Sequence, residues 1–362
     1  MPRVYALVAG LLLSTPSAAP TFANQRQYGT ADGPDSVAIA DLDGDGRPEI
    51  VTANGAGGAS VTILLNTRRS PFRTEVDLQT RDRAYGLSVA DFDRDGRPDL
   101  AVAEPDADRA SVILRPLDAK PIERVYRVGE EPLATAAADV NGDGLVDLVV
   151  GESHGRVAVL RATSPGRLGP RVDYAAGRQS AIVALADMTS DGKPDLVTAS
   201  YPGTLSVLRN DGRGRFGARR DTRIGKAPLS VAVGDLNRDD RLDVVTDDRA
   251  RHTFDVLLGR GNGTFRPVVV YRTGNDPVAV ALGDLNGDGK LDVVTANRGA
   301  NSVSVFVGRG DGTFARRRDH GVGRGPYGVA ARDLDGDGRL DVVTANTGNG
   351  TVSVLRNTTR SG

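Results

Sequence analysis

The sequence predicts an all-β fold, a seven-bladed β-propeller with four antiparallel strands in each blade. Three observations carry this prediction: an acidic motif recurs seven times, each repeat holds four short strand-like runs, and the repeats account for nearly all of the chain. Four strands in roughly every 45–50 residues is typical of propeller blades. With 362 residues, 39% of them apolar, the chain is long enough for one large all-β domain.

Four runs recur in order around the acidic motif, whose pattern is Asp-x-Asp/Asn-x-Asp-Gly-x-x-Asp. A small or β-branched run precedes the motif (277–281 in one repeat), and a run rich in Val and Thr follows it (342–346 in another). An alternating third run such as 302–306 leads through a Gly/Asn/Asp turn to a fourth, for example 266–271. Such short runs between Asx-Gly turns are typical of strands and hairpins.

The repeat also fixes a register. Successive motifs begin 48–50 residues apart, at Asp41, Asp91, Asp139, Asp187, Asp235, Asp284 and Asp333. Three residues earlier the side chain is always small, as an innermost strand near a central axis requires: Ala38, Ser88, Ala136, Ala184, Ala232, Ala281 and Ala330. Nineteen residues before the motif, five of the seven repeats have Phe, which we expect to anchor the outer strand: Phe22, Phe72, Phe216, Phe265 and Phe314.

The two ends of the chain predict how the ring closes. The last repeat ends after its third run, residues 351–356, and lacks a fourth. Residues 22–30 align without a gap on residues 265–273, which contain a fourth run. We therefore expect the N-terminal strand to complete the last blade and to remove free sheet edges.

Residues 1–23 are predicted to be a secretory signal peptide, which leaves residues 24–362 as a single propeller domain. Arg3 provides the positive start, residues 4–13 are apolar, and small residues with Pro follow. Cleavage is expected after Ala23, with Ala18 as the alternative. Ten apolar residues are too few to span a bilayer, so we expect a protein that is secreted or held at the cell surface. The chain has no Cys, so disulfides cannot stabilise it there.

The acidic motif is predicted to bind Ca²⁺ through side chains at positions 1, 3, 5 and 9 and the backbone carbonyl of position 7. Ca²⁺ accepts six to eight oxygen ligands, and an EF-hand is excluded because position 12 lies in a strand and is not Glu. An Asx-rich hairpin without metal stays open as the alternative. The predicted ligand positions are Asp41, Asp43, Asp45, Arg47, Glu49, Asp91, Asp93, Asp95, Arg97, Asp99, Asp139, Asn141, Asp143, Leu145, Asp147, Asp187, Thr189, Asp191, Lys193, Asp195, Asp235, Asn237, Asp239, Arg241, Asp243, Asp284, Asn286, Asp288, Lys290, Asp292, Asp333, Asp335, Asp337, Arg339 and Asp341.

The motifs, together with the Ser-Val-Ala and Val-Val-Thr-Ala-Asn runs, resemble the FG-GAP/VCBS repeats of seven-bladed propellers. Integrin α-subunit heads and many secreted bacterial proteins carry such repeats. The resemblance implies that each loop joins the first two strands of a blade and binds Ca²⁺, with up to seven ions. Thr189 departs from the pattern at position 3 of the fourth loop. Asp240 replaces the turn Gly of the fifth loop, whose site we expect to be empty.

Calcium would change the charge balance of the chain. The 46 basic and 47 acidic residues give a net charge of −1, which favours no nucleic-acid partner. Seven bound ions would raise the charge of the chain without Arg3 to +12, or to +10 with the fifth site empty. Because 42 of the basic residues are Arg, such a surface favours an acidic polysaccharide or an extracellular protein as partner. Scattered Arg that only keeps the protein soluble is the alternative. We expect a monomer without a membrane span.

Departures from the repeat mark the candidate ligand residues. Most belong to turns that should gather on the face opposite the acidic loops. Arg332 instead breaks the small-residue position just before a loop and is expected to point into the central channel. These candidates are Tyr85, Asp106, Arg109, Tyr201, His252, Tyr327 and Arg332.

The function predicted from these features is that of a secreted, calcium-binding module for binding or adhesion, without chemistry of its own. A lectin-like carbohydrate binder is the first alternative, although the absence of Trp and the small number of Tyr residues disfavour sugar stacking. A polysaccharide lyase or hydrolase is the second alternative. For that chemistry the sequence offers only His252 beside Arg251.

Overall fold

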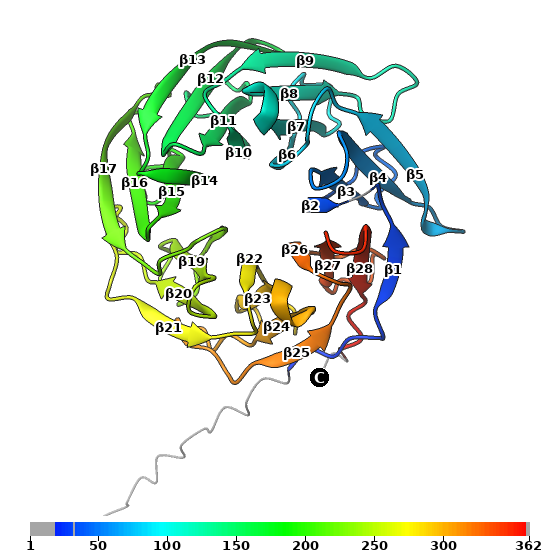
Figure 1. Cartoon of the computed structure of the whole chain (residues 1–362). Helices are drawn as coiled ribbons and strands as arrows, with labels where there is room; N and C mark the ends of the chain where they lie inside the picture. The colour runs from blue at the N-terminus through cyan, green and yellow to red at the C-terminus, as the bar shows by residue number, and fades with distance from the viewer. Residues whose placement is uncertain (1–18, 32, 360–362) are drawn as a thin grey trace, which may run out of the picture.

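Seven four-stranded antiparallel sheets surround a central axis (Figure 1). The computed structural model describes residues 19–31 and 33–359, so residues 1–18 of the predicted signal peptide lie outside the described residues. In six sheets the spatial order of the strands follows the chain order, as in β2-β3-β4-β5. The predicted seven-bladed propeller is therefore confirmed.

The blades follow one another around the ring. The strands of the first three blades are β2 (Pro34–Ala40), β3 (Glu49–Asn54), β4 (Ser60–Asn66), β5 (Pro71–Gln79), β6 (Leu87–Ala90), β7 (Asp99–Glu104), β8 (Arg109–Leu114), β9 (Ile122–Arg127), β10 (Pro132–Ala138), β11 (Asp147–Glu152), β12 (Arg156–Ser164) and β13 (Arg167–Ala175). Those of the fourth to sixth blades are β14 (Gln179–Ala186), β15 (Asp195–Tyr201), β16 (Thr204–Asn210), β17 (Phe216–Arg223), β18 (Val231–Gly234), β19 (Asp243–Asp248), β20 (Thr253–Leu257), β21 (Val269–Arg272), β22 (Pro277–Gly283), β23 (Asp292–Asn297), β24 (Ser302–Phe306) and β25 (Arg318–Gly321). The fourth strand of the fifth blade, β21, begins three residues later than predicted, after Pro267, which lacks a backbone donor.

The seventh blade joins the two ends of the chain. It consists of β26 (Pro326–Arg332), β27 (Asp341–Asn346), β28 (Thr351–Leu355) and, as its outermost strand, β1 (Arg26–Gly29). Strand β1 pairs antiparallel with β28, and Phe22 forms an isolated bridge to Asn357. The N-terminal strand therefore completes the last blade, as the alignment of residues 22–30 with residues 265–273 predicts.

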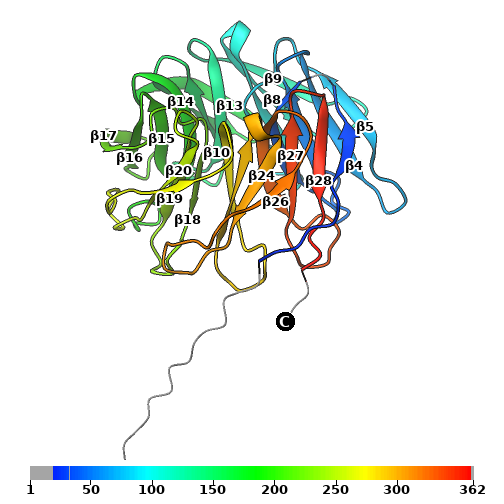
Figure 2. The same cartoon turned by 60° about the horizontal axis from the view of Figure 1, so that its bottom comes forward.

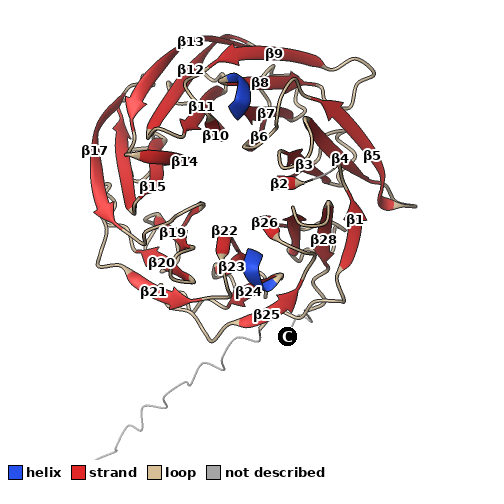
Figure 3. Cartoon of the chain, viewed as in Figure 1, coloured by secondary structure: helices blue, strands red, loops and turns tan. Residues whose placement is uncertain are grey.

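The connections divide between the two ends of the ring. The acidic loops and the turns between third and fourth strands lie at one end, and the other connections lie at the opposite end (Figure 2). Within the described residues, helix is confined to the 3₁₀ turns η1 (Pro105–Ala107) and η2 (Arg298–Ala300), both in turns between second and third strands (Figure 3). No helix in the described part of the chain is long and apolar enough to cross a membrane.

The hydrophobic core lies between adjacent blades rather than within single blades. One cluster combines Val51 and Ile63 of the first blade with Leu100 and Val102 of the second, and the cluster between the last and first blades joins residues from β27 and β28 to others from β3 and β4. Each blade is a thin sheet that buries its two faces only against its neighbours. The closed ring is therefore needed for every blade to bury its apolar residues.

Paired rings cross from one blade to the next at four blade boundaries of the outer rim. Tyr28 packs edge-on against Phe72, Tyr174 against Phe216, and Tyr271 against Phe314, with ring centroids 5.4–5.5 Å apart. His320 packs in the same way against Phe22, at 5.0 Å. The predicted Phe anchors thus fasten the outer strand of one blade to the outer strand of the preceding blade.

Candidate metal loops and the opposite face

All seven acidic loops connect the first two strands of a blade and share one backbone geometry. The N–H of position 6 donates to the carboxylate at position 1 in every loop, at 2.7–2.9 Å. The N–H of position 7 likewise donates to the carboxylate at position 5, at 2.8–3.2 Å. The chain therefore wraps around its own acidic side chains.

This wrapping requires left-handed backbone at positions 4 and 6 of each loop. Glycine occupies most of these positions, as at Gly44 and Gly46, where φ is +77° and +82°. The fifth loop has Arg238 and Asp240 instead, at φ +60° and +61°. Asp240 thus adopts the turn that Gly adopts elsewhere, at a cost on the order of 1 kcal/mol. The substitution strains the fifth loop without altering its hydrogen bonds, and its expected emptiness stays a prediction.

In three loops the structure brings carboxylates close enough to share one cation. Ligand atoms from three acidic residues lie within 4.8 Å of one another in the first, second and seventh loops. The groups are Asp41, Asp43 and Asp45; Asp91, Asp93 and Asp99; and Asp333, Asp335 and Asp341. The other four loops have Asn or Thr at position 3, at Asn141, Thr189, Asn237 and Asn286. Clustered hard oxygens on a tight loop fit Ca²⁺.

The acidic residue at position 9 has a second role that sequence reasoning missed. Asp147 is fully buried, and its two oxygens accept the N–H groups of Val140 in the loop and Ala162 at the end of the third strand. Glu49, Asp99, Asp243, Asp292 and Asp341 make the same pair of contacts in their own blades. In these six blades position 9 therefore joins the acidic loop to the second strand and to the end of the third.

Burial changes the proton affinity of these clamps. Desolvation raises the pKa of Asp99, Asp147 and Asp243 to about 6. It raises the pKa of Glu49 and Asp292 to about 7. Without a cation, burial thus disfavours the charged form of these groups, whereas a bound cation would favour it.

The fourth loop departs from the common clamp. Asp195 accepts the N–H of Asn210, but the N–H of Met188 donates to the carbonyl of Ala186 instead of to Asp195. The same loop has Thr189 at position 3. The fourth loop is therefore the one whose side-chain contacts, as well as its ligand set, differ from the rest.

Arginines at the ends of third strands reach several loops, and sequence reasoning did not identify them. Arg115 contacts Asp93 and Asp95 at 3.3 and 2.9 Å. Arg209 contacts Asp191 at 2.9 Å and lowers the pKa of that carboxyl group. Arg356 contacts Asp335 and Asp341 in the same way. These guanidinium groups neutralise part of the acidic charge, so an arriving cation would compete with them.

On the opposite face, two of the predicted ligand residues meet across the ring. The hydroxyl groups of Tyr85 and Tyr327 lie 2.8 Å apart, and Arg298 lies over the Tyr327 ring at 5.9 Å. Both tyrosines line a cavity of about 350 Å³ at the central axis, together with Asp35. Burial raises the pKa of Asp35 to about 6. This cavity is otherwise lined mainly by small and apolar residues of the innermost strands.

The other predicted ligand residues do not join this group. Asp106 forms a bidentate pair with Arg83, and Arg109 pairs with the fully buried Glu104 at 2.6 Å, so both have structural partners. Tyr201 is 49% exposed.

His252 and Arg332 lie elsewhere. The Nδ1 atom of His252 accepts the N–H of Asp276, and the side chain borders a cavity at the outer rim. Arg332 ends β26 beside the seventh acidic loop and donates to the carbonyl of Ile39 in the first blade. Arg332 therefore belongs to the acidic-loop end of the ring, and its guanidinium bridges two blades.

Solved structures with similar folds include two crystals of BBS1N in complex with ARL6DN, one soaked with mercury and the other with lead. Both give a TM-score of 0.67, at 14% and 13% sequence identity. They cover 94% and 93% of this chain and 98% and 97% of the matched chains. At such identities the likeness shows the fold alone. No curated protein sequence matches the chain significantly.

A family model described as the FG-GAP-like repeat matches five segments of the chain. The segments are residues 41–102, 139–198, 187–246, 247–295 and 284–344. Together they cover more than half of the sequence and include all seven acidic loops. The chain therefore belongs to the family of FG-GAP-like repeat proteins.

Proposed function

We propose that this protein is a secreted, calcium-stabilised propeller that acts as a binding or adhesion module without catalytic chemistry. The observation that carries the proposal is the common geometry of the seven acidic loops. In all of them backbone N–H groups hold the position 1 and position 5 carboxylates in place before any cation arrives. Preorganised carboxylates cost less to order when an ion binds.

The residues at positions 1, 3 and 5, with the position 7 carbonyl and position 9, would hold the ions. A bound Ca²⁺ would supply positive charge that offsets repulsion among three or four carboxylates in one loop. The chain's own contribution is the position 9 clamp, which transmits order in the loop to the second strand and the end of the third. Calcium would then stabilise the folded ring by mass action.

A rigid ring supports a display function. The strands hold the turns of the opposite face in fixed positions, which lowers the entropy lost when a partner docks. BBS1N, a propeller of similar fold, is described in complex with ARL6DN, which is consistent with a binding role for this architecture. Acidic polysaccharides and extracellular proteins are the partner classes that we propose.

Two features support binding over polysaccharide cleavage. A lyase needs a base near a group that neutralises the substrate carboxylate, and His252 beside Arg251 is the pair in question. The Nδ1 atom of His252 already accepts a backbone N–H, at 3.0 Å, so that nitrogen is engaged in positioning a turn. In the central cavity Asp35 accepts a hydrogen bond from Thr347, and the hydroxyl groups of Tyr85 and Tyr327 bond to each other. These side chains are therefore engaged with one another rather than arranged as a base beside a neutralising cation.

Direct measurement of calcium binding tests the proposal. Equilibrium dialysis at millimolar calcium, the affinity range of extracellular sites, should give several bound ions per chain. A variant with Asp333→Asn, Asp335→Asn and Asp337→Asn should lose about one of them. The matched control is Asp77→Asn, Asp173→Asn and Asp221→Asn, which removes the same charge from outer strands. Binding of no ions, or equal losses in both variants, would contradict the proposal.

A further inference from the structure

The outer rim between the fifth and sixth blades contains a concave site that is bordered by four arginines. Its volume is about 720 Å³, within the range of ligand pockets. Four guanidinium groups and one imidazole border it, and no carboxylate does among the described residues. The bordering cationic residues are Arg251, Arg272, Arg316, Arg317 and His252. We call this site the arginine notch.

The arginines of the notch are only partly neutralised. Arg251 lies 3.6 Å from Asp248, and Arg317 lies 3.4 Å from Asp319. Arg272 and Arg316 are exposed and form no ion pair with any described carboxylate. Two unpaired guanidinium groups facing one concavity create a field that favours an anion, and each can bind a carboxylate or sulfate in bidentate fashion.

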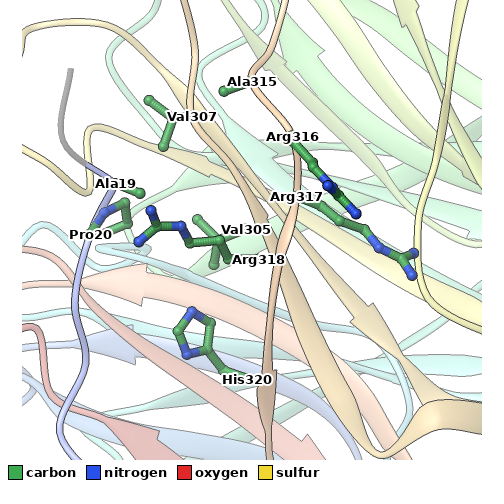
Figure 4. A pocket seen from close by; sticks show the side chains of 9 residues that line it. All are labelled: Ala19, Pro20, Val305, Val307, Ala315, Arg316, Arg317, Arg318 and His320. Carbon is green, nitrogen blue, oxygen red and sulfur yellow. The ribbon is translucent and has the colours of Figure 1, made fainter. Parts of the chain in front are cut away.

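The positive surface continues past the notch to the next blade boundary. Figure 4 shows Arg316 and Arg317 on one side of their chain segment and Arg318 and His320 on the other, near Pro20. A cavity of about 330 Å³ between the sixth and seventh blades is bordered by Arg318 and His320, by Arg316 and Arg317, and by Ala19 and Pro20, which stay in the chain when cleavage follows Ala18. One short segment thus offers cations to two neighbouring concavities, an arrangement that suits an extended chain bearing repeated negative charges.

The aromatic residues of the notch disfavour base stacking by a single-stranded nucleic acid. Phe306 and Phe314 are buried, at 3% and 5% exposure, and Tyr271 stacks on Phe254 while it packs edge-on against Phe314. Single-stranded nucleic acids bind by stacking bases on exposed aromatic faces, and here those faces are used in packing. A duplex needs a protruding element that enters its groove, whereas this site is concave.

We propose that the arginine notch binds an acidic polysaccharide through its carboxylate or sulfate groups. This proposal names the partner class of the binding module proposed above, and it rests on that function. Binding should weaken as ionic strength rises, because exposed guanidinium groups contribute through screened electrostatic attraction. Arg272 and Arg316 carry most of the recognition, since both are free of competing carboxylates.

The test compares two variants with equal charge loss. Arg272→Gln with Arg316→Gln alters the notch. Arg167→Gln with Arg223→Gln removes the same charge from the outer strands β13 and β17, where both arginines are exposed and border none of these cavities. The probes are dextran sulfate, hyaluronate, neutral dextran, and single-stranded and duplex DNA, with binding measured by calorimetry at millimolar calcium. The two acidic polysaccharides distinguish sulfate from carboxylate recognition.

The notch variant should bind the preferred acidic polysaccharide at least about tenfold more weakly, since charge-assisted hydrogen bonds are the strong ones. The rim control should stay within about threefold of the unaltered protein. Equal losses in both variants would show non-specific charge attraction and overturn the proposal, as would tighter binding of DNA or no binding of either polysaccharide.

Calcium-dependent melting of the same samples separates the two proposals. If calcium stabilises the protein but the notch variant and the rim control bind polysaccharide equally, only the notch proposal is contradicted. If only the notch variant loses polysaccharide binding and calcium does not stabilise the protein, only the proposed role of calcium is contradicted.

Discussion

The two ends of this ring differ in how strictly the seven repeats agree. At the acidic-loop end, every copy makes the same two hydrogen bonds between backbone and carboxylate, even where Asp240 replaces glycine. At the opposite end and along the rim, equivalent positions diverge: Tyr85 and Tyr327 replace smaller or aliphatic residues, and arginines gather beside one blade boundary. Under the proposals above, the uniform end stabilises the ring and the divergent surface binds the partner.

The largest expected effect is the pH dependence that the position 9 clamps give to the free energy of unfolding. Burial raises the pKa of Asp147 to about 6 and of Asp292 to about 7, above their unfolded values near 4. The folded chain without cations therefore holds more protons than the unfolded chain between about pH 4 and pH 7. The stability contributed by these groups should be complete at the acidic limit and should be lost as pH rises through 6 to 7.

Calcium should reverse that trend, because a cation favours the charged carboxylate. Melting temperatures measured between about pH 4 and pH 8, in EDTA and in calcium, check both slopes. If the melting temperature changed with pH in the same way in EDTA and in calcium, the position 9 carboxylates would not be coupled to cation binding.

Removal of one clamp should have the next largest effect. Asp147→Ala leaves two buried N–H groups without acceptors, which should lower the free energy of unfolding by about 3 kcal/mol. Asp143→Ala, at the exposed position 5 of the same loop, should cost at most about 1 kcal/mol in EDTA. Urea denaturation in EDTA measures both. If both substitutions lowered the free energy of unfolding equally, the position 9 carboxylate would have no structural role beyond that of the position 5 carboxylate.

The fifth acidic loop is strained, and relief of that strain should stabilise the protein slightly. Asp240→Gly relieves a left-handed residue at φ +61° and should raise the free energy of unfolding by about 0.5–1 kcal/mol. Arg238→Gly, at φ +60° in the same loop, is the matched change and should give a similar gain. Destabilisation by both substitutions would mean that the loop conformation differs from the one described.

The smallest effect is expected on the divergent face. Tyr201 is 49% exposed, so Tyr201→Ala should change the free energy of unfolding by less than about 0.5 kcal/mol. Denaturation in calcium and in EDTA should give the same small difference. A cost as large as that of Asp147→Ala would place this face in the stabilising framework and undo the division between the two ends.

The repeat pattern predicted the architecture because each blade carries its strands and turns in local sequence. The N-terminal closing strand was also predictable, since residues 22–30 align with a fourth strand elsewhere. The double hydrogen bonding of Asp147 was not, because it joins the loop to the end of a third strand, whose register depends on the folded sheet.

The ring pairs between blades correspond to a regular position in the sequence that the sequence analysis did not use. Tyr28, Tyr126, Tyr174 and Tyr271 all stand thirteen residues before an acidic motif, and His320 occupies the same position. The Phe partners of Tyr28, Tyr174, Tyr271 and His320 belong to the next repeat around the ring, so the pairing follows only when adjacent blades are considered together. The contact of Tyr85 with Tyr327, 242 residues apart, depends on the curvature of the closed ring and has no local signature.

Thermal melting in EDTA, magnesium and calcium measures whether cations stabilise the folded ring. Calcium at millimolar concentration should raise the melting temperature by several degrees over EDTA, because ions that bind only the folded ring stabilise it by mass action. Magnesium should do less, since it demands stricter octahedral geometry. Identical melting temperatures in EDTA and in saturating calcium would contradict the claim that cations in the acidic loops stabilise the ring.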